Sequence, residues 1–515
     1  MFYKKKIKVP KKECLEIKID DFSKGLNFNK DENLLDPKYS VNNYNFNYSK
    51  GVLTEGLGFE TLKCPNYQDN TLTEMMFDED LDPLPNLNKL WLYKIYDLKH
   101  GTEYDNGWLD KLMYYGENKL VYYHRIISIV PIMFQLGVKT LPDKPAFSFN
   151  IKYNGINYSL FGCESTGVYK FDNDTDPVLM TDMPKLSSMC EDKGKLFGTT
   201  FGEKDKIYYH VGGDFVNWTT QEDENNGKIE MNDERGKINK VIPFLGYVFA
   251  IRDYGISKIS HQEGKTKFDI THLSLNGNKI YDQTVKICGD KMLMLTKEGI
   301  MMFNGVTTKI LNLGVNDLLY NIENDDAIAC FHSGKYYLAC RIDFKDGNKV
   351  LCEEVDGYKN NAIVVLDVDN LSYDIIRGID CASMESIKLN KMDKVVMLLN
   401  NLERTKTIQF NDSGAFYSTP LKKKWVSTLT DLGYSNKIKF VREFNVLTKY
   451  PCKITIFTEK ESREYNVLGS NTLNKIKVDL KGKQIGLKIE SDTAKAYISN
   501  IKLKIDLLDY GFTRY

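Results

Sequence analysis

The chain has 515 residues, of which 42% are hydrophobic and 27% charged, a composition typical of a folded globular protein that excludes a disordered one. A chain of this length is too long for one ordinary core, so we expect about two or three domains. Lysine plus arginine and aspartate plus glutamate both number 70, and the resulting net charge of zero argues against attraction of the whole chain to nucleic acid or to an anionic membrane.

The sequence contains no signal for membrane insertion or secretion. Its longest apolar run, Ile126 to Phe134, is interrupted by Pro131 and falls short of the roughly 18 residues of a transmembrane helix. MFYKKKIKVPKKE has no apolar segment like that of a secretory signal. The basic residues from Lys4 to Lys12 predict a solvated arm, with contact to DNA as the alternative. The ten cysteines lack CxxC and CxxH spacing, so we expect reduced core residues in a protein made in a cytosol.

Residues 1–85 are predicted to form an N-terminal arm and lead-in strands. Tyr44, Phe46 and Tyr48 alternate with polar residues, which is the period of a strand with one apolar face. Three glycines follow closely and indicate a turn, because glycine takes positive φ without steric cost. Between Asp21 and Leu62 we therefore expect a short strand, a loop, a second strand and a turn.

Residues 86–414 are a series of short apolar or alternating runs separated by Gly, Asn and Asp turns. Turn pairs such as Asn154-Gly155 and Ser333-Gly334 join neighbouring runs and predict β-hairpins. The 3.6-residue period of a helix is nearly absent. The brief exceptions are Leu72 to Phe77, just before this region, and Val315 to Tyr320.

A short phrase, Gly-apolar-x-x-apolar, recurs in this region. It begins at Gly167, at Gly255 and at Gly299. A repeated antiparallel blade with glycine at its turn produces such a phrase, and here it returns at intervals of about 40 to 90 residues. The sequence therefore predicts an all-β fold whose central region is a β-propeller of about five to seven blades. One β-sandwich, or two stacked sandwiches, is the alternative.

The pattern changes after Gly414. Residues 415–515 show longer strands with clean alternation, as in Ile485 to Ile489 and Ile501 to Ile505, where one face is apolar and the other carries lysines. We predict a small antiparallel β-sandwich. Its strands are expected at residues 437–447, 452–458, 476–480, 484–491 and 496–507.

Two stretches near opposite ends of the chain resemble tail and neck proteins of tailed bacteriophages. Many of those proteins open with GGLN, a polar segment and a strand that leads to a glycine turn; here the order is GLN, a polar run to LLDP, and NNYNFNYSKGVLTEGLGF. Thr54-Glu55 stands where those proteins usually have a basic pair, and Gly213 to Trp218 resembles a turn of their propeller repeats. The matching positions are Asn43, Phe46, Gly51, Leu53 and Gly58 in the first stretch, and Trp425, Lys439, Arg442, Gly482, Leu487, Ile489, Ile501 and Gly511 in the second.

The resemblance implies a structural virion protein in the neck or tail, such as a tail hub, nozzle or packaged-DNA stabilisation protein. Similar proteins commonly form hexameric rings through which DNA is retained and ejected. We therefore expect self-association into a hexameric ring, contacts with the portal or adaptor and with other tail proteins, and passing contact with the phage DNA. The expected location is the virion, after synthesis in the host cytoplasm, and no enzymatic activity is expected.

No residue pattern indicates a catalytic, cofactor or metal site. The six histidines form no HxH or HExxH motif, and the phosphate-loop and GxSxG motifs are missing. His124 and His210 follow Tyr-Tyr pairs at predicted strand ends and are expected in the rim or the core. Asp172 to Asp176 alternates carboxylates as some calcium loops do, but Pro177 stands where an EF-hand needs glycine, so we expect a solvated turn. We thus expect no catalytic residue, no cofactor and no bound metal.

An alternative function is a glycan-binding or glycan-cleaving β-propeller. Aromatic residues such as Trp108, Trp218 and Tyr254 offer faces that stack on sugars, although packing inside blades explains them equally well. A glycosidase also needs paired carboxylates, and a chain with 70 acidic residues offers many pairs. The two functions differ in assembly, since a hub requires a closed ring whereas a lectin or glycosidase can act as a monomer.

Overall fold

The computed structural model describes most of the chain, and almost every regular element in the described part is a β-strand. The prediction of an all-β chain is confirmed. Within the described ranges the one helix, α1 (Asn316–Leu319), lies where a brief helix was predicted. The other predicted helix, from Leu72 to Phe77, is wrong, because its first residues form the strand β7 (Leu72–Glu74), which pairs with β6 (Lys63–Pro65). The described residues are 13–22, 40–48, 51–65, 72–74, 89–96, 108–126, 133–172, 176–262, 266–275, 277–344, 359–389, 392–400 and 407–509.

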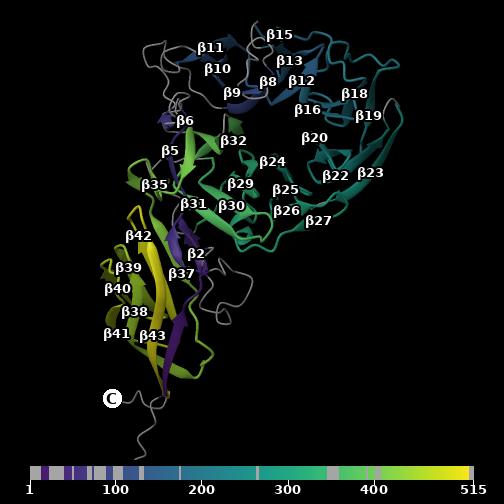
Figure 1. Cartoon of the computed structure of the whole chain (residues 1–515). Helices are drawn as coiled ribbons and strands as arrows, with labels where there is room; N and C mark the ends of the chain where they lie inside the picture. Colours follow the sequence, from purple (N-terminus) through teal and green to yellow (C-terminus); the bar gives the residue numbers. More distant parts are fainter. Residues whose placement is uncertain are drawn as a thin grey trace, which may run out of the picture.

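Seven small sheets, here called ring sheets 1 to 7, follow one another along the chain and stand around a common centre (Figure 1). Their strands pair antiparallel, except for one short parallel pairing in ring sheet 7. In the first six, four consecutive strands pair in chain order. Ring sheet 1 consists of β8 (Lys89–Tyr96), β9 (Trp108–Gly116), β10 (Lys119–Ile126) and β11 (Met133–Thr140). Ring sheet 2 consists of β12 (Phe147–Tyr153), β13 (Ile156–Cys163), β14 (Gly167–Phe171) and β15 (Val178–Leu179). Ring sheet 3 consists of β16 (Leu186–Asp192), β17 (Lys195–Thr200), β18 (Lys206–Val211) and β19 (Asn226–Glu230).

Ring sheets 4 to 6 repeat this arrangement. Ring sheet 4 consists of β20 (Ile238–Phe244), β21 (Tyr247–Arg252), β22 (Gly255–His261) and β23 (Phe268–Leu275). Ring sheet 5 consists of β24 (Ile280–Cys288), β25 (Lys291–Thr296), β26 (Gly299–Phe303) and β27 (Thr308–Ile310). Ring sheet 6 consists of β28 (Ile328–His332), β29 (Lys335–Cys340), β30 (Ala362–Asp367) and β31 (Tyr373–Arg377).

Ring sheet 7 is completed by a strand from the N-terminal stretch. The chain supplies β32 (Cys381–Leu389), β33 (Met392–Leu399) and β34 (Ile408–Asn411) in order, and β5 (Gly58–Thr61) then pairs with β34. Two short strands, β35 (Ala415–Phe416) and β36 (Thr419–Pro420), extend the sheet beyond β5. A Cβ on Gly58 would lie 2.5 Å from the Ala415 carbonyl oxygen, so only glycine lets the two backbones approach this closely.

The first strand of each ring sheet is the innermost, and these strands contact one another all the way around. β8 contacts β12, and the contacts continue through β16, β20, β24 and β28 to β32, which contacts β8 again. The apolar core lies between neighbouring sheets; for example, Phe249 of ring sheet 4 and Phe303 of ring sheet 5 have ring centroids 5.2 Å apart. Sheets packed face to face around an axis give the ring a propeller-like architecture.

Local sequence explains the repeated hairpins. The predicted turns Asn154-Gly155 and Ser333-Gly334 join the first two strands of ring sheets 2 and 6, and both residues of each pair have positive φ. Such turns match the right-handed twist of the strands that they connect. The recurring phrase occupies the third strand of ring sheets 2, 4 and 5, beginning at Gly167, Gly255 and Gly299.

A second unit, here called the paired sheets, consists of two sheets that face each other across one core. Strands were expected at five places in residues 437–507, and all five are present, together with β40, which was not predicted. One sheet contains β2 (Ser40–Tyr44), β37 (Lys423–Ser427), β42 (Ile485–Ser491), β39 (Cys452–Thr458) and β40 (Ser462–Val467), and the other contains β3 (Phe46–Asn47), β4 (Leu53–Glu55), β43 (Tyr497–Asp509), β38 (Lys437–Thr448) and β41 (Asn474–Gly482), with β1 (Glu13–Ile19) also on β43.

Strands from both ends of the chain build the paired sheets. β2 pairs with β37, while β1 and β4 both pair with β43, so the N-terminal strands, purple in Figure 1, lie beside the yellow C-terminal ones. Trp425 is fully buried in their common core, where its ring meets Phe22 edge to face at a centroid distance of 5.1 Å. Residues 1–85 were predicted to form an arm and lead-in strands. In the structure, strands β1 to β4 of this stretch belong to the paired sheets, and β5 belongs to ring sheet 7.

Two further expectations concern cysteines and membranes. Seven of the eight described free cysteines are buried, and Cys14 is exposed. Among the described residues no helix has the length and apolar character needed to cross a membrane. The basic arm from Lys4 to Lys12 lies outside the described residues.

Candidate functional site

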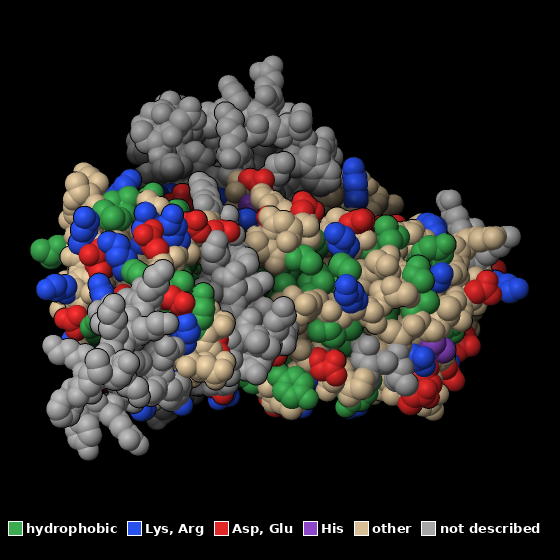
Figure 2. Space-filling view, turned by 90° about the horizontal axis from the view of Figure 1, so that it is seen from below, with side chains coloured by type: hydrophobic (Ala, Val, Ile, Leu, Met, Phe, Trp, Pro, Cys, Tyr) green, Lys and Arg blue, Asp and Glu red, His purple; other side chains and the backbone are tan. Residues whose placement is uncertain are grey.

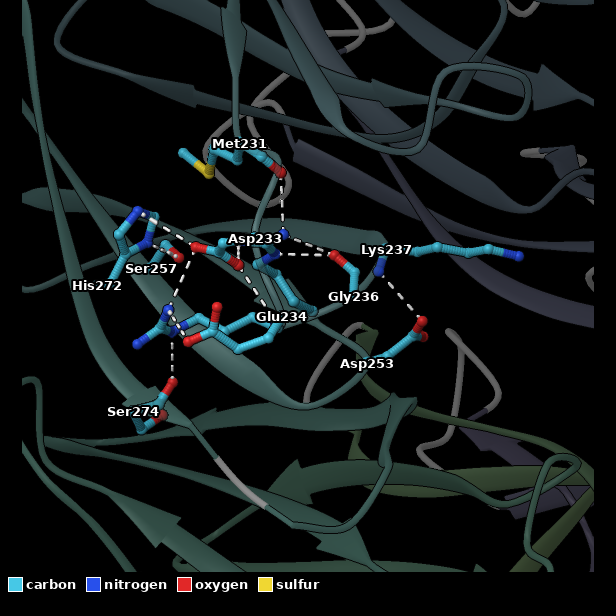
Figure 3. A network of polar contacts seen from close by, with 11 residues as sticks. Met231, Asp233, Glu234, Gly236, Lys237, Asp253, Ser257, His272 and Ser274 are labelled. Atoms are coloured by element: carbon cyan, nitrogen blue, oxygen red, sulfur yellow. Dashed lines mark hydrogen bonds and ion pairs between the residues drawn. The ribbon is translucent and has the colours of Figure 1, made fainter.

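A polar network of charged contacts surrounds the connection between β19 and β20 (Figure 3). Asp233 lies in the connection between these strands. Its Oδ1 is 2.6 Å from Arg252 Nη1 and accepts the Arg235 N–H at 2.9 Å. Its Oδ2 is 3.2 Å from Arg235 Nη1 and 3.3 Å from His272 Nε2. The carboxylate therefore joins a loop to two strands of ring sheet 4.

Arg252, on β21, is only 1% exposed and binds the backbone of the same loop. Its Nη2 donates to the carbonyl oxygens of Met231 at 2.9 Å and Gly236 at 2.7 Å, and its Nε donates to Gly236 at 3.0 Å. Burial alone would raise the pKa of Asp233, but the Arg235 N–H and the charges of Arg252 and His272 lower that pKa below its ordinary value. The carboxylate is thus held ionised against Arg252, which is the arrangement that a buried guanidinium requires.

The connectivity Ser257–His272–Asp233 resembles the hydrogen-bond chain of a hydrolase triad. Ser257 Oγ lies 2.9 Å from His272 Nδ1, and His272 Nε2 faces Asp233. Ser257, however, is 0% exposed, and a nucleophile must reach its substrate. Arg235 and Arg252 also bind the Asp233 carboxylate, whose negative charge would orient the histidine in a catalytic triad. The network therefore fastens the loop between ring sheets 3 and 4 and does not form an accessible catalytic centre.

A second buried cluster, formed by Asp192, Lys195 and His261, also joins ring sheets 3 and 4. It lies near the strand ends opposite to those that hold the Asp233 network. Lys195, which is fully buried, donates to the Gln262 carbonyl and lies 3.4 Å from His261 Nδ1. His261 Nε2 lies 2.9 Å from Asp192 Oδ2. Burial lowers the pKa of His261, the Lys195 charge lowers it further, and Asp192 opposes both. A neutral His261 can donate to Asp192 and accept from Lys195, so the cluster is satisfied without a ligand.

The third cluster joins the ring to the paired sheets at Asn45, where the chain passes from β2 to β3. Asn45 has φ of 60°, a conformation that asparagine tolerates better than most residues. Its side chain bonds to the backbone of Arg377 at the end of β31 and donates to the Lys422 carbonyl at 2.7 Å. Its own N–H donates to the Ile375 carbonyl at 2.8 Å. One residue thus fixes the outer strand of ring sheet 6 to the paired sheets.

Neighbouring side chains reinforce this junction. The Arg377 guanidinium lies over the rings of Tyr44 and Phe344, at 4.8 and 4.3 Å from their centroids. Tyr48 donates to the Tyr373 carbonyl. Asn47 Nδ2 approaches Asp374 Oδ2 at 3.5 Å, and burial raises the pKa of Asp374 to about 7, with Lys335 opposing the shift. The junction therefore contains an acid that titrates near neutral pH.

The residues considered from sequence fall in different places. His210 is buried, as expected of a core histidine, and burial lowers its pKa. Trp218 is 0% exposed and packs in the core between ring sheets 2 and 3, whereas Tyr254 is 40% exposed. Asp176 forms an ion pair with Lys139 at 3.0 Å. Most of the Asp172 to Asp176 turn, and the side chains of Trp108 and His124, lie outside what the structure describes.

The described part of the chain also contains a small polar hollow, and its potential metal ligands are dispersed. Among the described residues, no group of three or more His, Cys, Asp or Glu side chains is arranged to hold a metal ion. A small hollow beside β26 and β27 is lined by polar residues including Asn278, Glu298 and Lys309. The clusters around Asp233 and Asn45 were not predicted, because their members come from separate strands and leave no spaced motif in the sequence.

Comparisons with known proteins give only distant likenesses. No protein-family model matches the chain, and no curated protein matches it in sequence. Among solved structures, it is similar to BBS1N in complex with ARL6DN (9% identity, TM-score 0.37, 59% of this chain and 86% of that chain). It is also similar to the extracellular domain of the putative hybrid two-component system BT4673 of B. thetaiotaomicron (13%, 0.39, 88% and 67%) and to Kluyveromyces lactis Hsv2 (12%, 0.33, 58% and 94%).

Proposed function

We propose that the chain is a structural virion protein of a tailed bacteriophage and forms part of the neck or tail. The observation that supports this proposal is the pairing of the two stretches that carry the resemblance. β2 and β4 come from the first stretch, and they pair with β37 and β43 of the second. Two sequence signatures at opposite ends of the chain therefore belong to one folded unit.

The proposal includes the finer architecture. We count each ring sheet as one blade, which gives a seven-bladed β-propeller with its last blade closed by β5. The paired sheets form a β-sandwich that stands on the outer strand of the sixth blade through Asn45. Such a rigid two-part body is suited to transmitting load between neighbours, because its parts are joined by buried hydrogen bonds.

The proposed role is mechanical and depends on contact surfaces. Figure 2 shows basic and acidic side chains interspersed over the face in view, with hydrophobic side chains scattered among them. A mixed surface of this kind matches the polar rim of a contact between subunits, whereas the buried centre of such a contact is depleted in charge. In the proposed assembly, copies of the chain form a hexameric hub or nozzle ring that contacts the portal or adaptor and other tail proteins, and DNA passes through the ring.

The alternative, a glycan-binding or glycan-cleaving propeller, has less support. Of the three aromatic residues considered for sugar stacking, Trp218 is buried, and stacking requires an exposed ring face. Tyr254 remains available at the surface.

Electron microscopy of the purified chain, mixed with a phage portal complex, tests the proposal. We expect closed rings with a channel wide enough for duplex DNA, formed alone or on the portal. Solution mass distinguishes rings from monomers. A chain that stays monomeric, does not bind the portal complex and binds a polysaccharide on a glycan array would overturn the proposal in favour of the alternative.

A further inference from the structure

Charge is distributed unevenly between the two units of the chain. Residues 415–515, which supply most strands of the paired sheets, contain 19 Lys and Arg against 10 Asp and Glu, although the whole chain has no net charge. The rest of the chain is therefore acidic by the same margin. Such an asymmetry within one chain is typical of proteins whose basic part contacts a surface of opposite sign.

Lysines form a row across the outer face of one of the paired sheets. Lys18 of β1 lies directly opposite Lys502 of β43, and Asn445 of β38 lies between Lys502 and Lys475 of β41. The neighbouring residues of these strands belong to the apolar core, so the lysines point away from it. Lysines opposite each other on a sheet repel. Glu16 is shared between Lys18 at 3.8 Å and Lys502 at 3.9 Å, which relieves this repulsion only in part.

The next row across the same face is also short of carboxylates. Glu443 lies between Lys504 and Lys477 and forms its ion pair with Lys504, at 2.9 Å. Among the residues that the structure describes, no carboxylate lies within 4.0 Å of the ammonium groups of Lys475 and Lys477, which are both exposed. The outward lysines of the two rows are here called the lysine face: Lys18, Lys475, Lys477, Lys502 and Lys504.

An acidic surface lies on ring sheet 3. β19 is the last strand of this sheet and pairs with β18. From residue 222 to residue 234, β19 and the loops on either side of it contain six Asp and Glu against one Lys. That lysine, Lys228, is paired with Glu222 at 3.0 Å. The exposed glutamates of this stretch are here called the acidic edge: Glu222, Glu224, Glu230 and Glu234.

The lysine face and the acidic edge lie at opposite ends of the molecule. Figure 1 shows β38, β41 and β43 at the far end of the paired sheets, whereas β18 and β19 lie on the side of the ring away from them. Exposed charges more than about 10 Å apart are largely screened at roughly 0.1 M salt. The two surfaces therefore do not neutralise each other within one chain, and each matches the charge of the other on a second copy.

We propose that the lysine face of one copy binds the acidic edge of a second copy, so that the chains associate head to tail. A contact between two different surfaces leaves one of each free at the ends of a pair. It therefore repeats from copy to copy and gives a ring where the rotation closes. The inference rests on the proposed ring, for which it names the contact between neighbouring copies.

Sedimentation velocity of the full chain, alone and with a phage portal complex, tests the contact at low and high salt. Between about 0.1 M and about 1 M sodium chloride the Debye length falls from about 10 Å to about 3 Å. We expect association at the lower salt and association at least about tenfold weaker at the higher salt. Association that is the same at both salts would overturn this inference and leave the ring. Monomers under every condition would overturn both.

Charge reversal separates this contact from other modes of association. Lys475→Glu with Lys477→Glu makes the lysine face acidic, and Glu230→Lys with Glu234→Lys makes the acidic edge basic. Each double variant alone should associate at least about tenfold more weakly, because two surfaces of like charge then meet. An equimolar mixture of the two double variants should recover the association, since every face then finds an edge of opposite charge.

A double variant with the same change of net charge is the matched control. Lys267→Glu with Lys309→Glu reverses two exposed lysines of ring sheets 4 and 5 and should associate as the unaltered chain does. Circular dichroism verifies that each variant is folded, and recovery in the mixture shows it independently. A mixture of folded variants that stays dissociated, or equal association by the face, edge and control variants, would overturn the inference. Rings that form regardless of these charges would show that the copies meet through another surface.

Discussion

The side-chain amide of Asn45 pairs with the backbone of Arg377 in the way that one strand pairs with the next. Asn45 Nδ2 donates to the Arg377 carbonyl at 3.0 Å, and Asn45 Oδ1 accepts the Arg377 N–H at 2.8 Å. The two residues are 332 positions apart in the sequence. A single amide thus extends the hydrogen-bond ladder of β31 into the paired sheets.

Replacing this amide should destabilise the chain. Asn45→Ala leaves the buried Arg377 N–H without its partner and places alanine at φ of 60°, so we expect a loss of about 2 to 4 kcal/mol in the free energy of unfolding. Asn500→Ala is the matched control, because Asn500 is exposed and has φ of 52°. It should lose only about 1 kcal/mol. Equal losses in urea unfolding would show that the Asn45 hydrogen bonds contribute nothing.

Arg252 should be intolerant even of a conservative change. Arg252→Lys keeps the charge but cannot reach Asp233, Met231 and Gly236 together, so we expect destabilisation of about 3 kcal/mol. Faster hydrogen exchange should be confined at first to residues 231–237, the loop that Arg252 holds. Arg463→Lys, at an exposed position, should change stability by less than about 1 kcal/mol. Unaltered exchange in the loop of Arg252→Lys would contradict the assigned role.

The junction should weaken as pH rises toward neutrality. The pKa of Asp374 is raised to about 7 in the folded chain, against about 3.9 when unfolded. Between these values the folded chain holds a proton that the unfolded chain has released. Stability therefore falls through this window, and the stabilisation is fully lost above pH 7.

Asp374→Asn removes this titration. From pH 5 to pH 7, the unaltered chain should lose about 2 kcal/mol more than Asp374→Asn does in the free energy of unfolding. Asp369→Asn, in the exposed turn before β31, should retain the pH dependence of the unaltered chain. Parallel curves for the unaltered chain and Asp374→Asn would refute the role of this carboxyl.

Local patterns were sufficient to predict the strands but not their partners. Asn154-Gly155 and Ser333-Gly334 specify their hairpins because both residues of a tight turn adopt positive φ, a preference that lies within the turn itself. The alternation of apolar and other residues from Ile485 to Ile489 likewise predicts a strand from neighbouring residues alone. Leu72 was assigned to a helix because a few residues cannot distinguish a short helical period from a strand that pairs with β6.

The candidate sites could not be predicted, because each depends on contacts between distant residues. Asn45 stands in the first of the two stretches that resemble phage tail proteins, yet nothing near it in the sequence indicates that its partner is Arg377. The same is true of Asp233 with Arg252. Residues 1–85 were predicted to be a separate lead-in because they precede the repeated strands in the chain. The pairing of β1 and β4 with β43 depends instead on proximity in three dimensions, which the sequence order does not reveal.

The completion of ring sheet 7 by β5 also sets the order in which a growing chain can fold. β5 is made early, but its partner β34 is made much later; Glu60 and Gln409, which hydrogen-bond across the pair, are 349 residues apart. At ordinary rates of translation, β5 waits roughly 20 to 70 seconds for this partner. A chain interrupted before residue 408 leaves the edges of β5 and β33 that β34 would cover without a partner, and unpaired strand edges favour aggregation. The ring can therefore close only after synthesis has passed this point.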